Sequence, residues 1–236
     1  LFDDWEMKAK FSYFHASQEL DTNLIIFPPG SDIGLGGSFP DGVIGNPEVF
    51  EKHYRTGINA NYTALDDHNV TIGIGYDISD LYKAQESKNF AFGPNGEYLP
   101  PGSPVVDVTD TPFVFISEGD RKNGYLLVQD IWQIAKDWEL TTGIRYDDYS
   151  DFGSTVNPRV ALVWTTSLNL TTKFLYGSAF RAPNFAEMRV TNNPANLGNS
   201  NLTPETIDTY ELAFNYHAYD SLNYGVSFFT YDWQDI

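Results

Sequence analysis

A period-two alternation of apolar and polar side chains runs through most of this chain. Between residues 137 and 148, Trp138, Leu140 and Ile144 alternate with polar residues such as Glu139 and Arg145. Successive side chains of a β-strand point to opposite faces, so the pattern predicts a strand with one apolar and one polar face. Eight other segments follow the same rule, the second and last of them less regularly: 5–13, 123–135, 54–62, 70–78, 156–164, 168–181, 209–217 and 222–233. We therefore predict an all-β antiparallel fold of nine strands without a helix.

The connections between these strands alternate in length. Short turns are expected at 65–68, 136–137, 165–167 and 219–221, whereas the other connections cover 18–48, 83–122, 149–155 and 182–204. All but one of the latter are long, so short turns fall on one rim and long loops on the other. Transmembrane β-barrels sort their connections in this way, with short turns on the periplasmic side. A soluble β-sandwich has no reason to do so.

Composition narrows the possible functions. The 236 residues contain 14 Lys and Arg against 32 Asp and Glu, a formal net charge of −18, and no cysteine. The acidic balance argues against nucleic-acid binding, and the lack of cysteine excludes disulfides, Cys-ligated zinc and a thiol nucleophile. The sequence begins at Leu1 without a signal peptide and contains no run of about 18 apolar residues. A transmembrane strand needs only about 9–11 residues, of which every second one is apolar.

Aromatic residues occur where a barrel would meet the two membrane interfaces. Three tryptophans lie beside short turns, and four other rings lie near the long loops: Trp132, Trp138 and Trp164, then Tyr146, Tyr149, Tyr176 and Phe180. Amphipathic rings favour membrane interfaces, although aromatics are also common in ordinary strands. Together with the sorted loops, these positions favour a membrane barrel.

Two motifs resemble a hallmark of TonB-dependent outer-membrane receptors. Residues 176–188 read YGSAFRAPNFAEM, and residues 198–212 read GNSNLTPETIDTYEL. In that family, an "AFRAP" strand end leads into an extracellular loop that returns through "GNPNLKPE" and "YELG". The segments at 128–132, 143–147 and 157–161 also resemble the family's "QDEW", "G.RYD" and "P R.AL" patterns. The resemblance is strong over 121–236 and general over 1–120. Ser200, Thr203 and Ala213 depart from it.

The resemblance implies a transport function in the outer membrane of a Gram-negative bacterium. Such receptors import scarce nutrients, most often ferric siderophores, with energy supplied by the TonB complex. A plug domain fills the family's barrel, and no plug or TonB-contacting segment is recognised here. The chain begins within a strand, has an odd strand count and lacks a terminal aromatic strand. We therefore expect residues 1–236 to be a fragment, truncated at both ends, of a barrel of about 22 strands.

The two motifs also have a physical interpretation at the rim. Pro183 cannot donate to a strand ladder, so a strand should end there, and Pro204 should precede the returning strand. Arg181 has the parity of the polar face, and we expect it to pair with Glu187 or Glu205. We interpret these five residues as a structural fastening of the barrel rim.

No residue pattern indicates catalysis. His15, His53, His68 and His217 have no metal-ligand spacing, and no GxSxG motif is present. We therefore predict no catalytic residue, metal site or cofactor. Ligand-binding residues cannot be named individually, but the loops 83–122 and 182–204 are favoured, because binding usually lies on loops above a rigid scaffold. The first contains five aromatic rings: Phe90, Phe92, Tyr98, Phe113 and Phe115.

Two other functions stay open. A passive porin would need no energy source and no plug. A soluble secreted protein that binds or cleaves carbohydrate would bury the apolar faces in a core rather than against lipid. The expected partners of the favoured function are TonB, a small ligand such as a ferric siderophore, and outer-membrane lipid.

Overall fold

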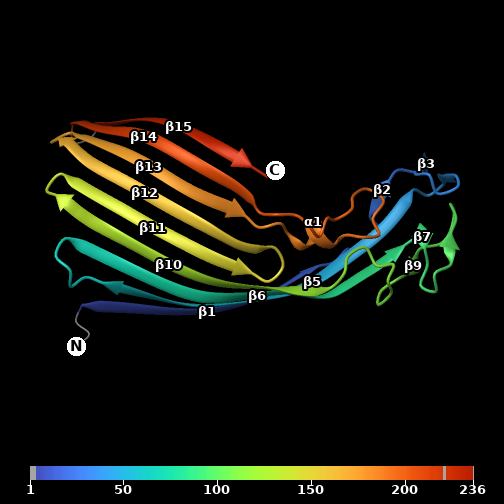
Figure 1. Ribbon diagram of the computed structural model, residues 1–236. Helices are drawn as coiled ribbons and strands as arrows, with labels where there is room; N and C mark the ends of the chain where they lie inside the picture. Colours follow the sequence, from blue (N-terminus) through green and yellow to red (C-terminus); the bar gives the residue numbers. More distant parts are fainter. Residues whose placement is uncertain (1–3, 220–221, 236) are drawn as a thin grey trace.

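Nine long strands lie side by side in one curved antiparallel sheet (Figure 1). The computed structural model describes residues 4–219 and 222–235, so Asp220 and Ser221 of the expected last turn lie outside the described residues. The long strands are β1 (Trp5–Gln18), β5 (Val43–Tyr62), β6 (His68–Lys88), β10 (Gly119–Ala135), β11 (Trp138–Tyr149), β12 (Gly153–Ser167), β13 (Leu170–Arg181), β14 (Glu205–Tyr219) and β15 (Leu222–Gln234). Each pairs with the next long strand along the chain. The predicted all-β antiparallel fold is confirmed.

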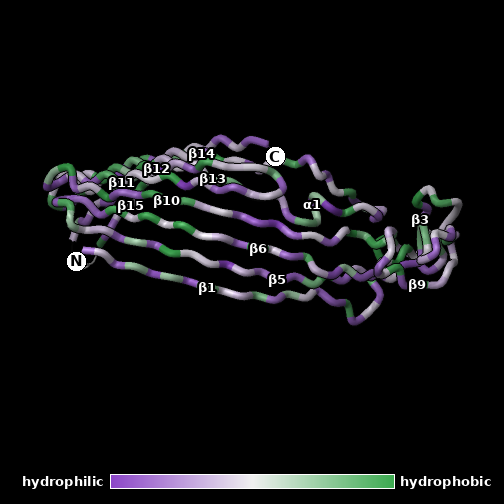
Figure 2. Tube along the Cα trace, turned by 60° about the horizontal axis from the view of Figure 1, so that its bottom comes forward, coloured by the Kyte–Doolittle hydropathy of each residue, from purple (hydrophilic) through white to green (hydrophobic). Residues whose placement is uncertain are grey.

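The two faces of the sheet differ in polarity, and hydrophobic and hydrophilic residues follow one another along strands such as β5 and β6 (Figure 2). One face carries apolar side chains that stay between 46% and 54% exposed: Ile58, Ile74, Leu126, Ile144 and Phe174. The other face is polar and forms a hollow of about 240 Å³ across neighbouring strands, lined by Lys10, Arg55, Asp77, Tyr125 and Arg145 among others. An exposed apolar band of this extent indicates contact with a non-aqueous environment.

A β-bulge interrupts the alternation in β6. Phe50 of β5 pairs with Lys83, but the next residue, Glu51, pairs with Leu81, so Tyr82 has no register partner. An extra residue in one strand shifts the side-chain parity beyond it. Leu81 and Ala84 consequently pack in the same buried cluster although their positions differ in parity.

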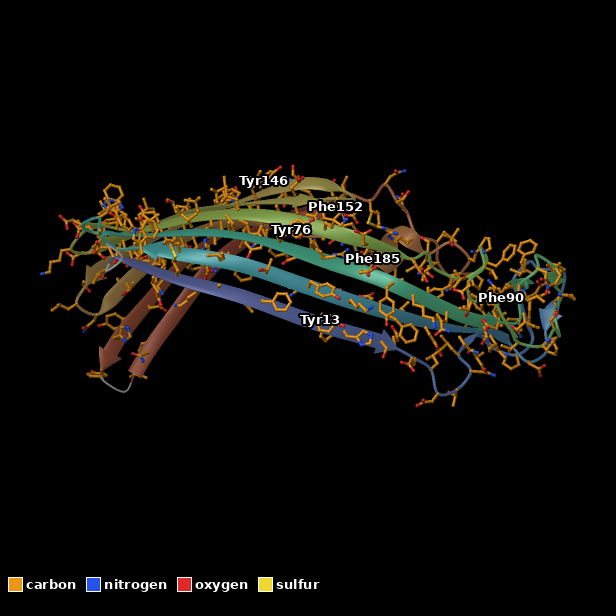
Figure 3. All side chains as sticks on the ribbon, turned by 90° about the horizontal axis from the view of Figure 1, so that it is seen from below. Tyr13, Tyr76, Phe90, Tyr146, Phe152 and Phe185 are labelled. Atoms are coloured by element: carbon orange, nitrogen blue, oxygen red, sulfur yellow. The ribbon has the colours of Figure 1, made fainter. Side chains whose placement is uncertain are left out.

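Beyond the bulge, β5 and β6 continue into a segment that we call the outer extension, residues 19–48 and 84–118. It projects past the ends of the other long strands (Figure 1). Six short strands build it: β2 (Ile25–Phe27), β3 (Ser31–Asp32), β4 (Ser38–Phe39), β7 (Ala91–Phe92), β8 (Tyr98–Leu99) and β9 (Val106–Asp107). Phe39, Val43 and Phe90 form a buried cluster here, and Figure 3 labels Phe90 within it. The expected long loops are therefore partly strand and carry a core of their own.

A short helix, α1 (Phe185–Arg189), corrects the prediction that the chain has no helix. Its five residues are too few to show a helical period in the sequence. In the part of the chain that the structure describes, no helix is long and apolar enough to cross a membrane.

A charged substitution on the exposed apolar face tests whether this face is surrounded by lipid. We expect Ile144→Arg to destabilise the folded protein by about 2–4 kcal/mol if the residue lies near a bilayer midplane. Thr141→Arg, on the polar face of the same strand, should have little effect. Urea unfolding of the full-length protein in lipid vesicles would measure both, and equal costs on the two faces would contradict a lipid-facing assignment.

Candidate functional site

A network of three charged side chains joins the ends of β13 and β14. Arg181 Nε donates to Glu205 Oε2 at 2.9 Å, and its second terminal nitrogen also binds Glu205. The remaining terminal nitrogen donates to both Glu187 carboxylate oxygens at 3.0 Å. Arg181 thus contacts both acidic residues that the sequence proposed as partners. We call these three residues the rim fastening.

The rim fastening is linked to the start of α1. Asn184 Oδ1 accepts a hydrogen bond from the Glu187 backbone N–H at 2.8 Å, and Glu187 Oε2 accepts one from the Asn184 N–H at 2.8 Å. This reciprocal capping box satisfies two backbone donors that the first helical turn would otherwise leave free. Glu187 therefore stabilises the helix and binds Arg181 at the same time.

The two prolines flank the rim fastening. β13 ends at Arg181, two residues before the buried Pro183, and β14 begins at Glu205, directly after Pro204. Arg181 and Glu205 are register partners, so the strands reach the rim at the same level. The structure places all five proposed rim residues at one end of this strand pair.

The two loops favoured for ligand binding contact each other. Ile116 and Val190 form an antiparallel bridge, and the Thr191 N–H donates to the Phe115 carbonyl at 2.9 Å. Asn192 Nδ2 lies 2.9 Å from the carbonyl oxygen of Val114. Residues 105–118 and 182–204 are therefore one connected unit at the loop end of the sheet. The sequence contained no signal for this pairing, because it joins segments that are far apart in the chain.

Helix α1 docks this unit against the polar face of the sheet. The Arg121 and Arg189 guanidinium groups each lie 5.3 Å from the centre of the Phe185 ring, which is labelled in Figure 3. Arg121 also pairs with Asp151 at 2.7 Å. Beside the helix lies a hollow of about 320 Å³, lined in part by Val49, Glu51, Leu81, Phe115, Asn184 and Phe185. Both favoured loops thus contribute to one partly apolar pocket at the loop end.

The five aromatic residues of loop 83–122 divide into two groups. Phe90 and Phe115 are buried at 2% and 8% exposure and act as core residues. Phe92 and Tyr98 are exposed, and the Phe92 ring lies 5.4 Å from that of Phe113. Phe92 and Tyr98 can contact a ligand directly from solution, whereas Phe115 presents only its small exposed part to the hollow beside α1.

A buried ion pair in the outer extension was missed by the sequence reasoning. Lys88 Nζ lies 3.6 Å from Glu86 Oε2 and also donates to the Phe113 carbonyl, and both side chains are at most 2% exposed. Burial raises the pKa of Glu86 to about 7. A Glu-x-Lys spacing on a strand puts both side chains on one face, but nothing in the sequence distinguishes a buried face from a solvated one here.

The polar face of the sheet contains a second charged network. Arg145 binds Asp147 through two hydrogen bonds of 2.7 Å, and Asn123 Nδ2 donates to Asp147 Oδ1 at 3.0 Å. The Arg145 guanidinium lies 4.0 Å from the centre of the Tyr125 ring. Gly57 and Gly75 leave room for the Tyr125 side chain, because a Cβ on Gly57 would lie 2.6 Å from its hydroxyl oxygen and one on Gly75 would lie 2.4 Å from its ring. The polar face is thus internally ordered by side-chain pairs.

The histidines are separate from one another. His53 binds Glu51 and Ser79 at 2.9 Å on the polar face, and His68 binds Asp130 at 2.7 Å beside a short turn. His15 contacts Tyr82, and His217 contacts Asn223. Among residues 4–219 and 222–235, no group of three or more His, Asp or Glu side chains could hold a metal ion.

The rim fastening should respond to acid. Hydrogen bonds from Arg181 lower the pKa of Glu187 and Glu205 below their ordinary 4.5. A lowered pKa stabilises the folded rim above pH 4.5, and this contribution is lost as the pH falls through the lowered values. We expect proteolysis within 182–204 to accelerate below about pH 4 in the native protein. Arg181→Gln should already be cleaved faster at pH 7 and depend less on acid, and identical pH profiles would contradict the assignment.

The buried ion pair allows a matched comparison of two lysines. Lys88→Met leaves Glu86 buried without its cation, a change that costs about 3–5 kcal/mol in protein interiors. Lys83→Met, on the same strand but partly exposed above the Phe50 ring, should cost less than about 1 kcal/mol. Hydrogen exchange across residues 84–118 would report both, with faster exchange expected only in Lys88→Met. Equal exchange in the two variants would mean that the pair does not hold the extension together.

The sequence matches the family model described as "TonB dependent receptor-like, beta-barrel" over residues 1–236. It is 32% identical over 116 residues to the vitamin B12 transporter BtuB of Vibrio cholerae. The aligned segment covers 48% of this chain and 18% of that protein. It is also 32% identical over 113 residues to the iron-regulated outer membrane virulence protein of the same species, covering 46% and 17% of the two chains.

A solved structure has a similar fold. A crystal structure of the ferric enterobactin receptor PfeA of Pseudomonas aeruginosa superposes with a TM-score of 0.66 and 17% identity, over 99% of this chain and 33% of that one. The aligned regions thus span less than a fifth of the curated relatives and a third of this structural relative. The match over the whole chain decides the family: this protein belongs to the TonB-dependent receptors, within the β-barrel domain that the family model describes.

Proposed function

We propose that this chain is part of an outer-membrane receptor that imports a scarce nutrient, namely iron as a ferric siderophore, with energy from the TonB complex. The observation that carries the proposal is the joined pair of loops, 105–118 and 182–204, held over the polar face of a sheet whose other face is apolar and exposed. The relatives named above include an iron-regulated outer-membrane protein and a receptor for ferric enterobactin. Transport, rather than catalysis, is the function of such receptors.

In this proposal the apolar face contacts outer-membrane lipid and the polar face lines the lumen. The short turns lie on the periplasmic side and the outer extension on the extracellular side. A ligand arriving from outside would first meet the extension and then the pocket beside α1. Residues 1–236 would form a part of a larger barrel, of about 22 strands.

The rim fastening has a positioning role in this mechanism. Arg181, Glu187 and Glu205 set where the loop leaves β13 and returns to β14, while Asn184 orients α1. A loop fixed at both ends loses less conformational entropy when it contacts a ligand. These residues therefore hold the binding surface in place, and none of them needs to touch the ligand.

Uptake by living cells tests the proposal. We expect a strain that lacks the full-length receptor to lose uptake of its iron-loaded siderophore, and the restored gene to recover it only in cells with functional TonB. Phe185→Ala should reduce uptake at least several-fold, since it removes the ring that docks α1. Phe174→Ala is the control, because it removes an exposed ring from the apolar face of the sheet. Uptake that continues without TonB would favour a passive porin. Recovery of the protein in the soluble secreted fraction would favour a carbohydrate-binding protein.

A further inference from the structure

The far end of the outer extension presents a cluster of exposed aromatic rings. The Phe92 ring lies 5.4 Å from that of Phe113 and 6.5 Å from that of Tyr98. The Phe92 and Tyr98 side chains are 45% and 47% exposed. The buried cluster of Phe39, Val43 and Phe90 lies in the same outer extension but does not cover them. Their faces are therefore available to a molecule in solution.

Two contacts fix this aromatic cluster in position. The Tyr98 hydroxyl donates to the Leu35 carbonyl, which ties the β7–β8 hairpin to the loop between β3 and β4. The buried Lys88 amine donates to the Phe113 carbonyl and so anchors the backbone that carries the third ring. The rings are thus presented on a fixed scaffold at the end of the extension, where β3 and β7 lie in Figure 1.

The surroundings of the rings are acidic. The outer extension, residues 19–48 and 84–118, contains ten carboxylates but only one Lys or Arg side chain, Lys88. Lys88 is 1% exposed and paired with Glu86, so it contributes no cation to the surface. Eight of the ten carboxylates are exposed: Glu19, Asp21, Asp32, Asp41, Glu97, Asp107, Asp110 and Glu118. The solvent-facing charge of the extension is therefore wholly negative.

We propose that the outer extension captures cargo that carries a net positive charge. Exposed aromatic faces bind cations through the ring quadrupole, and a surface of one sign concentrates ligands of the opposite sign and raises their association rate. The same field repels anionic cargo. The inference rests on the proposed function, which it narrows. Among ferric complexes, it selects hydroxamates that keep a free ammonium group over the strongly anionic tris-catecholates.

A matched pair of ligands isolates charge from shape. Ferrioxamine B carries a free ammonium group and a net positive charge, whereas its N-acetylated derivative is neutral and otherwise alike. A second pair tests cobalamin, the nutrient of the vitamin B12 transporter named above. In this pair, aquacobalamin is positive and cyanocobalamin is neutral. Whichever pair the full-length receptor binds, we expect the positive member to associate about tenfold faster than the neutral member at low salt. The difference should disappear in about 1 M salt, where charges are screened.

Receptor variants assign this effect to the extension. Glu97→Gln combined with Asp110→Asn, which removes two of the eight exposed carboxylates, should reduce the rate advantage of the positive ligand and leave the rate of the neutral ligand unchanged. Asp67→Asn is the matched control, because Asp67 and Asp110 are both exposed turn residues with a φ near +60° at opposite ends of the sheet. Phe92→Ala should increase the dissociation rate of the positive ligand.

The outcomes separate the two proposals. Equal association of the charged and neutral ligands, or an equal loss in Asp67→Asn and in the double variant, would overturn the capture surface while leaving the transport function intact. A full-length receptor that binds neither pair of ligands nor any other ferric siderophore would overturn the proposed function itself and the capture surface with it.

Discussion

Backbone pairing between neighbouring strands, with side chains forced to alternate between two faces, is the constraint on which the rest of the structure depends. Nine strands satisfy one another's N–H and C=O groups in chain order, so the sheet needs few buried side chains to hold its shape. The fully buried residues are correspondingly concentrated at the loop end, around Phe39, Phe90 and Phe115. Inside a bilayer this arrangement is required, because lipid offers no partner to a free backbone group.

The contacts that hold the loop end together differ from those that hold the strands together. There the structure depends on the side-chain contacts of the rim fastening and of the buried Glu86–Lys88 pair, and on the backbone bridge between Ile116 and Val190. The Ile116–Val190 bridge joins two loops that the sheet alone would leave independent, and Lys88 ties β6 to the loop at Phe113. A rigid wall and a separately fastened set of loops are suited to a receptor, because the loops can bind while the wall stays unchanged.

The sequence predicted the wall much better than the loops. Alternation such as Trp138, Leu140 and Ile144 is a local property, so it located all nine long strands, and the proline motifs located the ends of β13 and β14. Helix α1 was missed because a five-residue helix depends on the Asn184 cap rather than on periodicity. The contact of loops 105–118 and 182–204 was not predictable, since it is a long-range contact with no local pattern.

The bulge at Tyr82 has a consequence for how this region is compared between relatives. Before Tyr82, even-numbered residues of β6 lie on the apolar face, whereas after it Ala84, Glu86 and Lys88 are turned toward the buried interior. One unpaired residue therefore marks where the regular wall of the sheet ends and the outer extension, with a buried cluster of its own, begins. Any alignment that omits this residue assigns every later side chain of the strand to the wrong environment, and evolution could lengthen or replace the element beyond it without altering the wall.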